Sequence, residues 1–311
     1  MRESHVPMPK IAQKTLLTWM TLLGVICWLW VGMAHAAADG PETNSAASLR
    51  AKYQALAPQL SNNQFKRPLY IDSVETPSQL RGDVYALVDY PFAVVNQAFN
   101  DPDHWCDMLI LHINTKYCHA STNQAVSLLE VRIGKKDYQP VGQASPVDFA
   151  YRVATTTPEY FDVGLSAKTG PLGTSDYRIR LEAVAIQSDK TFLHITYSYA
   201  YNFSGRLAMQ AYLATIGRDK VGFSVTGTTA SGPPDYIGGV RGVVERNTMR
   251  YYLAIDAYLG AESTPPAQQL EKRLQSWFTA TELYARQLHE MDRAAYLDMK
   301  RREYRRQQAP Q

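Results

Sequence analysis

Short stretches in which apolar and polar side chains alternate dominate the middle of the chain. A two-residue period is typical of a strand with one face in a core and the other toward solvent. Such a period, or a comparable aliphatic run, occurs at 69–71, 81–88, 126–133, 149–155, 160–167, 177–186, 191–203, 221–225 and 239–258. The pattern therefore predicts a largely antiparallel sheet.

A period of three to four residues marks the predicted helices. Short helices are expected at 48–57, at 92–111 with a break at Asp101-Pro102, and at 205–215. The clearest repeat comes last, where side chains at steps of four and three form a mostly apolar stripe. It comprises Leu270, Leu274, Trp277, Thr281, Tyr284, Leu288 and Met291. This spacing predicts one long amphipathic helix, whose stripe requires a wide apolar surface to cover it.

The first 36 residues have the pattern of a secretory signal peptide. Arg2, Lys10 and Lys14 form a basic start, and residues 15–33 carry no charge. The small-x-small sequence Ala34-His35-Ala36 follows, as at a signal peptidase site. We therefore expect a periplasmic or secreted protein that is cleaved near Ala36. A retained membrane anchor is the alternative, because an uncharged stretch of this length can also cross a bilayer.

Export changes the interpretation of the cysteines. Cys27 would leave with the signal peptide, and Cys106 and Cys118 would remain as a pair in an oxidising compartment. We expect these two to form a disulfide. The alternatives are a free thiol, or a metal site completed by His104, His112 or His119. Because the histidine spacings differ from those of common structural zinc sites, no metal is predicted.

Composition and motifs exclude several classes of function. The net charge is +3 in 311 residues, whereas nucleic-acid-binding domains carry a strongly basic surface. The sequence contains no glycine-rich nucleotide motif after a strand, no HExxH and no GxSxG. We therefore predict no nucleic-acid partner and no cofactor, and we assign no catalytic residue.

The order of the predicted elements and one motif resemble the START-like (helix-grip, SRPBCC-type) superfamily. The motif is a strand followed by Asp89-Tyr90-Pro91, Val94-Val95, Asp101-Pro102 and Trp105. The resemblance implies an α+β helix-grip fold, in which a curved antiparallel sheet wraps around a long C-terminal helix and leaves a cavity between them. The rival architecture is a β-sandwich or a lipocalin-like barrel with appended helices.

The resemblance covers residues 80–292 and sets the expected domain boundaries. Residues 1–36 are the signal peptide, and 37–79 form a leader with an N-terminal helical extension. Residues 293–311 form a basic C-terminal tail, in which Lys300 to Arg306 is rich in positive charge. The tail is either a solvated helix end or a weak contact for the surface of an anionic membrane.

Alternate residues of the strands face the cavity in a helix-grip fold. The tyrosine-rich strands and the last helix supply the candidate ligand-binding side chains, which are Tyr197, Tyr199, Tyr201, Tyr251, Leu253, Trp277 and Tyr284. The alternative is that these residues only build the core. Arg178 and Arg180 are expected on the outer face. In the reversed register an arginine would lie inside the cavity and hold an acidic lipid headgroup.

Three functions remain open from the sequence. The first, which the sequence favours, is a protein that binds a hydrophobic small molecule or lipid in the cavity. The second is an enzyme of cyclase or hydrolase type, in which His194 or Asp256 transfers protons beside a cavity tyrosine. This hypothesis requires that His194 or Asp256 face the cavity. The third is a structural envelope protein whose partner is another protein.

Overall fold

The computed structural model describes residues 44–123, 126–215, 217–228, 232 and 234–309. The predicted signal peptide, its cleavage site and the leader up to residue 43 lie outside the described residues. Within these ranges no helix combines the length and the apolar character needed to cross a bilayer.

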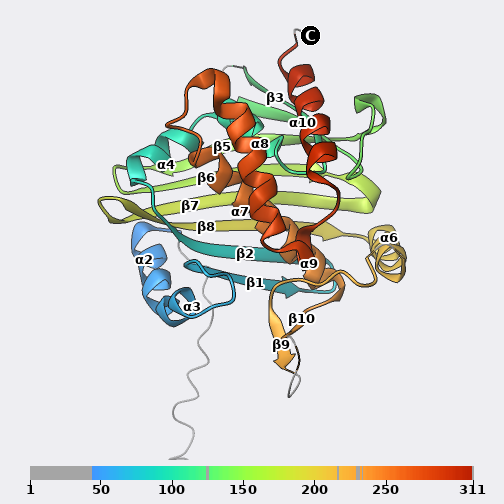
Figure 1. Ribbon diagram of the computed structural model, residues 1–311, viewed down its shortest axis with the longest axis horizontal. Helices are drawn as coiled ribbons and strands as arrows, with labels where there is room; N and C mark the ends of the chain where they lie inside the picture. Colours follow the sequence, from blue (N-terminus) through green and yellow to red (C-terminus); the bar gives the residue numbers. More distant parts are fainter. Residues whose placement is uncertain (1–43, 124–125, 216, 229–231, 233, 310–311) are drawn as a thin grey trace, which may run out of the picture. The chain divides into compact units, whose positions relative to one another are not determined.

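An antiparallel sheet forms the centre of the described structure (Figure 1). In this part of the chain eight strands lie in the order β1-β2-β8-β7-β6-β5-β4-β3. Strands β3 to β8 therefore follow the chain, and β2 closes against β8. The strands are β1 (Leu69–Glu75), β2 (Gln79–Val88), β3 (Thr115–Asn123), β4 (Val126–Ile133), β5 (Ser145–Thr156), β6 (Tyr160–Thr169), β7 (Thr174–Gln187) and β8 (Lys190–Tyr201).

The two faces of the sheet carry different side chains, because successive residues of a strand point to opposite sides. In β8, Leu193, Ile195 and Tyr197 belong to the main apolar core. Phe192, on the opposite side, belongs to a second and smaller apolar cluster. The face that carries Leu193, Ile195 and Tyr197 is the inner face below, and the face that carries Phe192 is the outer face.

Two short helices follow β2 where the aspartate-proline pattern predicts them. α4 (Phe92–Phe99) and α5 (Pro102–Leu109) are separated at Asp101, whose side chain accepts the Asp103 N–H at 2.9 Å. This acceptor satisfies a donor that has no partner inside the helix. Pro102 suits the first turn because no N–H is needed there.

A disulfide joins Cys106 of α5 to Cys118 of β3, which confirms the predicted pair. Both cysteines are buried. Since β3 is an edge strand, the bond ties the second short helix to that end of the sheet. Among the residues that the structure describes, no three His, Cys, Asp or Glu side chains are grouped to hold a metal ion.

The segment 239–258 is a helix rather than the predicted strand. α7 (Gly239–Leu259) is buried on nearly every side, and its buried residues include Val244, Tyr252 and Ile255. It packs against β1, β2 and β8 on one side and against α8 on the other. A helix that is buried on nearly every side lacks the division into an apolar and a solvent-exposed polar face, so it shows no clear helical period. Its valine and tyrosine content favours strands locally, and burial overrides that preference.

The chain has the predicted helix-grip fold, with α7 as the helix that the sheet grips (Figure 1). The order is a strand, two short helices, six antiparallel strands and then a long buried helix. The predicted fold class is therefore confirmed, whereas the identity of the gripped helix is corrected. It is not the C-terminal helix of the chain.

The predicted long helix is divided into α8 (Pro266–Glu282) and α9 (Ala285–Leu288). Its apolar stripe is real, but it covers α7 and the last helix instead of the sheet. Trp277 donates its Nε1–H to Arg250 O at 3.2 Å. On its other side the Trp277 ring stacks on Tyr296, with ring centroids 4.9 Å apart.

The predicted basic tail is mostly a docked helix, α10 (Arg293–Gln307), which packs against β3 and α8. The Tyr296 hydroxyl donates to Leu111 O at 2.8 Å. Lys300 is fully buried, and its Nζ donates to His112 O at 2.7 Å. This end of the chain is therefore part of the folded body rather than a solvated tail.

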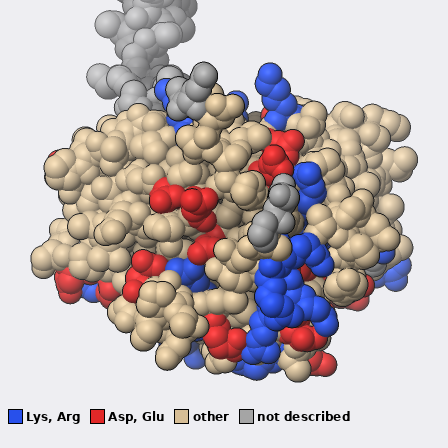
Figure 2. Space-filling model, turned by 90° about the horizontal axis from the view of Figure 1, so that it is seen from above, with Lys and Arg blue, Asp and Glu red and all other residues tan. Residues whose placement is uncertain are grey.

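Figure 2 shows a band of Lys and Arg side chains beside the C-terminal end of the described chain. Two of the α10 arginines already have acidic partners. Arg301 lies 2.6 Å from Glu271, and Arg302 lies 2.8 Å from Asp298. Because this pairing reduces the charge available to an anionic surface, the fold adds no support to the expected membrane contact.

The predicted N-terminal helical extension is present as α2 (Ala46–Ala55) and α3 (Ala57–Ser61). Leu49 and Leu60 pack with Phe192 in the smaller apolar cluster. The extension therefore covers part of the outer face, opposite α7. β1 also precedes residue 80 and pairs with β2, so the sheet begins before the expected domain boundary.

One further helix, α6 (Phe203–Ala214), follows β8 where the period at 205–215 predicts it. In Figure 1 it lies at one end of the sheet. The predicted strand at 221–225 is replaced by a small ribbon of β9 (Val225–Thr228) and β10 (Pro234–Tyr236). Two single 3-10 turns complete the described elements, η1 (Val141–Gln143) and η2 (Pro171–Gly173).

Candidate ligand-binding site

A cavity of about 320 Å³ lies between the inner face of the sheet, α7 and α6. This volume falls within the ~300–1,000 Å³ of small-molecule sites. A neighbouring hollow of about 780 Å³ shares Thr174, Tyr199, Gly205 and Met209 with it. The first space is called the main cavity below, because it is the one between the sheet and the gripped helix.

Tyrosine rings form much of the wall of the main cavity. Tyr177 and Tyr199 stack with ring centroids 5.2 Å apart, and Tyr197 lies 5.2 Å from Tyr251 by the same measure. Burial raises the pKa of Tyr197 well above its usual value. The phenol therefore stays protonated and neutral. Such walls offer aromatic contact area together with a few hydroxyl groups that orient a ligand.

Only some of the seven predicted ligand-binding residues line a cavity. Tyr197, Tyr199 and Tyr251 line the main cavity, and Tyr201 lines only the neighbouring hollow. The other three lie elsewhere. Leu253 is in the core, Trp277 packs beneath α10, and Tyr284 donates its hydroxyl to Phe65 O at 3.3 Å.

One end of the main cavity is polar, and His112 lies there with only 3% of its surface exposed. The ring stacks on Tyr251 at 4.7 Å between centroids. Its Nδ1 accepts the Asn114 N–H at 3.2 Å, so the neutral ring carries its hydrogen on Nε2. Among the described residues Nε2 has no hydrogen-bond partner.

The charge of His112 follows from its surroundings. Burial holds the pKa of His112 well below its usual value, and the nearby positive charges of Arg250, Lys300, Lys136 and Lys116 lower it further. The ring is therefore a neutral hydrogen-bond donor in an electropositive environment.

Two arginines from α7 complete this polar end. Arg246 and Arg250 are four residues apart, so both lie on the same side of the helix, and each is only 2% exposed. Arg250 donates to Glu290 at 2.7 Å. Arg246 donates to Val221 O at 3.1 Å, and no described carboxylate lies within ion-pair distance of it.

Sequence reasoning missed these three polar residues for different reasons. The strand predicted at 239–258 gives no reason to place Arg246 and Arg250 together at a cavity, because residues four apart in a strand are not close neighbours. Their four-residue spacing would have been a signal only in a helix. The sequence offers His112 as a possible metal ligand and gives no local signal that places it at a cavity. Its position in the turn before β3 depends on how α5 and α10 pack.

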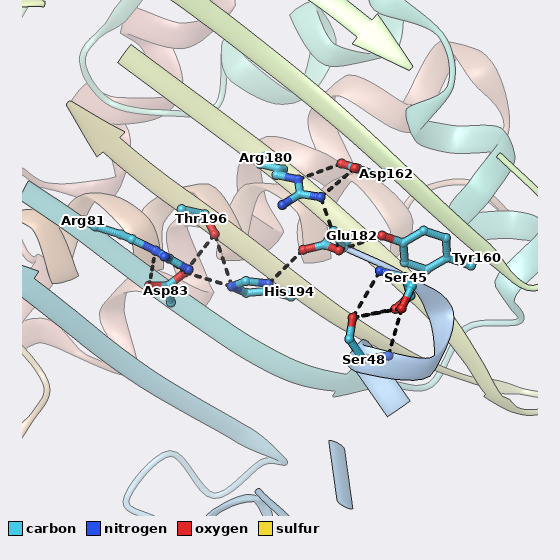
Figure 3. A network of polar contacts seen from close by, with 10 residues as sticks. All are labelled: Ser45, Ser48, Arg81, Asp83, Tyr160, Asp162, Arg180, Glu182, His194 and Thr196. Carbon is cyan, nitrogen blue, oxygen red and sulfur yellow. Dashed lines mark hydrogen bonds and ion pairs between the residues drawn. The ribbon is translucent and has the colours of Figure 1, made fainter. Parts of the chain in front are cut away.

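A second polar cluster lies on the outer face and centres on His194 (Figure 3). Its Nε2 lies 2.8 Å from Asp83 Oδ1, and its Nδ1 lies 3.2 Å from Glu182 Oε2. The ring also stacks on Tyr85, with centroids 4.1 Å apart. Both ring nitrogens are thus engaged on the side of the sheet that faces away from the main cavity.

Arg180 belongs to the same outer cluster, as expected from the alternation in β7. It donates to the two oxygens of Asp162 at 2.8 and 2.6 Å. Arg180 also lies 3.4 Å from Glu182, which links this pair to His194, and the Tyr160 hydroxyl donates to the same carboxylate at 2.7 Å (Figure 3). Arg178 also lies away from the core and is exposed. The reversed register is therefore excluded.

Asp256 does not line the main cavity either. It lies on α7 beside Arg67, 3.1 Å from that guanidinium, and borders a different hollow that contains Tyr90 and Tyr284. Since neither His194 nor Asp256 faces the main cavity, the proton-transfer hypothesis that named these two residues does not fit the fold.

Comparison with known proteins leaves the function open. No protein-family model matches the chain, and no curated protein matches it significantly. Solved structures with some likeness include an aromatase/cyclase from a Streptomyces species, with 11% identity, 45% of this chain and 74% of that chain covered, and a TM-score of 0.30.

Two further structures have similarly low scores. Norcoclaurine synthase from Thalictrum flavum has 11% identity, with 46% of this chain and 77% of that chain covered, at a TM-score of 0.30. Ara h 8.0201 has 10% identity, with 62% and 99% covered, at 0.34. Scores this low carry no argument about this chain, so its fold is defined by its own strand order and by the position of α7.

Proposed function

We propose that this protein binds an apolar, partly aromatic small molecule or a single-chain lipid in the main cavity. The observation that carries the proposal is the cavity itself, which has a volume of about 320 Å³ and lies between the sheet and α7. Its walls combine tyrosine rings with the aliphatic side chains of Ile133 and Val147. Apolar walls with few polar groups suit a hydrophobic ligand.

α6 supplies a wall of the cavity that can open for ligand entry. Its residues Ala208 and Met209 line the cavity, yet Gly205 is the only buried residue of this fully described helix. Its outer surface exposes Phe203 by 82% and Leu207 by 57%. Elements with little buried surface open at low free-energy cost, and α6 is such an element.

The start of α6 is held more firmly than the rest. Asn202 accepts the Gly205 N–H at 3.0 Å. A Cβ at Gly205 would lie 3.0 Å from Gly173 O, a tight contact, so this close approach to η2 favours glycine. The helix can therefore move about its N-terminal end while the sheet stays in place.

Uptake of a neutral fluorescent probe tests this proposal. N-phenyl-1-naphthylamine should bind the purified protein saturably and gain fluorescence in the apolar cavity. The variant Ala208→Trp should fill the cavity and weaken binding by about tenfold or more, equivalent to at least about 1.4 kcal/mol.

Ala211→Trp is the matched control, because Ala211 lies on the same helix but is exposed. It should leave probe binding unchanged. Absence of saturable binding to the unmodified protein, or equal binding by the two tryptophan variants, would contradict the proposal.

Export is the second part of the proposed function. The signal-peptide pattern of residues 1–36 motivates it, and the disulfide supports it because such bonds persist in oxidising compartments. When the full chain is expressed in a bacterial host, the intact mass of the periplasmic fraction should correspond to a chain cleaved near Ala36. An uncleaved chain in the membrane fraction would favour the anchor instead.

A further inference from the structure

We infer that the ligand of the main cavity is an amphipathic anion, whose acidic group binds between Arg246, Arg250 and His112 while its apolar body contacts the tyrosine wall. This inference rests on the proposed function and specifies its ligand class. The acidic group is a carboxylate or a phosphate, since arginine binds both by paired N–H donors.

The first argument is the unused donor of His112. Its Nδ1 is already occupied by the Asn114 N–H, and its Nε2–H has no partner among the described residues. The ring is nine-tenths buried or more and lines the main cavity. A buried donor without an acceptor costs free energy, and an anionic oxygen in the cavity would supply that acceptor.

The second argument is the imbalance of charge at this end. Arg246, Arg250 and Lys136 line the cavity, whereas no described Asp or Glu does. Glu290 lies behind the wall and is shared by Arg250 at 2.7 Å, Lys136 at 2.6 Å and Lys220 at 3.4 Å. One carboxylate for several cations leaves an excess of positive charge.

Arg246 carries the largest part of that excess. It is almost fully buried, and among the described residues its only hydrogen-bond partner is Val221 O at 3.1 Å. A buried charge is stable when it is paired with an opposite charge. A bound anion would therefore supply the opposite charge that Arg246 lacks. A neutral ligand would leave Arg246 without an ionic partner, and a cationic ligand would be repelled.

The tyrosine wall and the polar end of the cavity are close enough for one ligand to contact both. Tyr251 touches both ends, since its ring stacks on His112 and lies 5.2 Å from Tyr197 between centroids. A molecule that contacts the tyrosines is therefore also close to the polar end. An apolar tail and an acidic head on one molecule satisfy both parts of the wall.

Displacement of N-phenyl-1-naphthylamine by a matched series tests the inference. The series is decanoate, decyl phosphate and decanol, which share the same alkyl chain. We expect at least one of the two anions to displace the probe at a concentration about tenfold or more below that of decanol, which is about 1.4 kcal/mol. The ranking of decanoate against decyl phosphate distinguishes the two acidic groups.

Substitution of the arginines assigns the effect to this end of the cavity. Arg246→Met keeps the apolar stem and leaves no carboxylate unpaired, so it should remove most of the preference for the anion while decanol binds as before. Arg250→Gln is the second variant and should act in the same direction. Arg293→Met is the control for net charge, since Arg293 lies on the surface of α10 against Phe278.

The outcomes separate the two proposals. If the probe binds and decanol displaces it as well as both anions do, the inference fails and the proposed function stands. If neither the probe nor any member of the series binds, both fail. A preference for the anion that persists in Arg246→Met and Arg250→Gln would also overturn the assignment to these residues.

Discussion

His194 is a buried histidine that contacts two carboxylates. It lies between Asp83 and Glu182 on the outer face, with both ring nitrogens engaged. Burial alone would lower the pKa of His194, but hydrogen bonds to the two carboxylates outweigh it and the pKa is raised. When the ring is protonated, it joins β2, β8 and β7 through charge-assisted contacts.

The raised pKa fixes the sign of the pH dependence. A histidine whose pKa is higher in the folded state binds a proton more readily there than in the unfolded chain. Its stabilisation is complete below the unfolded value of about 6.5 and is lost as the pH rises through the folded value. The pKa of Asp83 and of Glu182 is lowered, because hydrogen bonds to His194 and other groups exceed the opposing effect of burial. Their contribution is present above the unfolded carboxylate values and is lost in acid.

The variant His194→Gln should therefore be most destabilised near pH 6. Removal of one partner from a buried charged cluster costs roughly 3–5 kcal/mol in the free energy of unfolding. Urea unfolding of both proteins from pH 5.5 to 9.5 should show the difference shrinking as the pH rises.

His289→Gln is the matched control, because His289 pairs with Glu282 at 3.0 Å on the surface. It should change the free energy of unfolding by less than about 0.5 kcal/mol at every pH. Lys300, whose pKa is lowered to about 8 mainly by burial, adds a slope of opposite sign to all three proteins. A difference for His194→Gln that stays constant with pH would contradict the assigned charge.

Among single elements, α5 and β3 are linked by the one covalent bond between described side chains. The sequence separation of the two cysteines is 12 residues. Closing a loop of this size stabilises the folded state by about 3 kcal/mol in the chain-entropy model.

The double variant Cys106→Ala, Cys118→Ala should lower the free energy of unfolding by about that amount. Urea unfolding without reductant measures it. With a strong reductant, the unmodified protein should approach the variant once it unfolds, and the variant itself should not respond. Equal stability of the two proteins without reductant would show that the bond does not stabilise the fold.

The strands and α7 differ in whether their structure can be predicted from the periodicity of the sequence. The strands alternate because one face of the sheet meets a core and the other is partly open, so a period of two is visible in residues such as Ile179 and Arg180. α7 is covered by the sheet on one side and by α8 on the other. Burial on all sides removes the polar face that would have marked it as a helix.

For the whole molecule, the position of α10 decides where the folded body ends. Tyr296 is fully buried and connects α10 to α8 and to the turn before β3. Lys300 and Lys116 both lie within 3.1 Å of Glu303, which makes a buried charged contact between α10 and β3. The C-terminal helix thus helps to hold the wall on which His112 lies.

The substitution Tyr296→Ala should therefore lower the free energy of unfolding by roughly 3–5 kcal/mol. Arg305→Ala, at an exposed position of the same helix, should change it by less than about 0.5 kcal/mol. Thermal and urea unfolding followed by circular dichroism measure both. Equal, small effects would mean that α10 is not part of the cooperative unit.

The sequence by itself determined the features that depend on neighbours along the chain. These are the alternating strands, the break at Asp101-Pro102, the cysteine pair and the helix-grip order of elements. Each has a local signal, because a strand, a cap or a turn is specified by residues a few positions apart.

Only the tertiary structure decided what depends on distant contacts. It showed that 239–258 is the gripped helix, that Arg246 and Arg250 rather than Arg178 and Arg180 lie at the main cavity, and that 293–307 is docked. The physical reason is the same in each case. Burial by segments far apart in the sequence outweighs local preference, and no window of neighbouring residues contains that information.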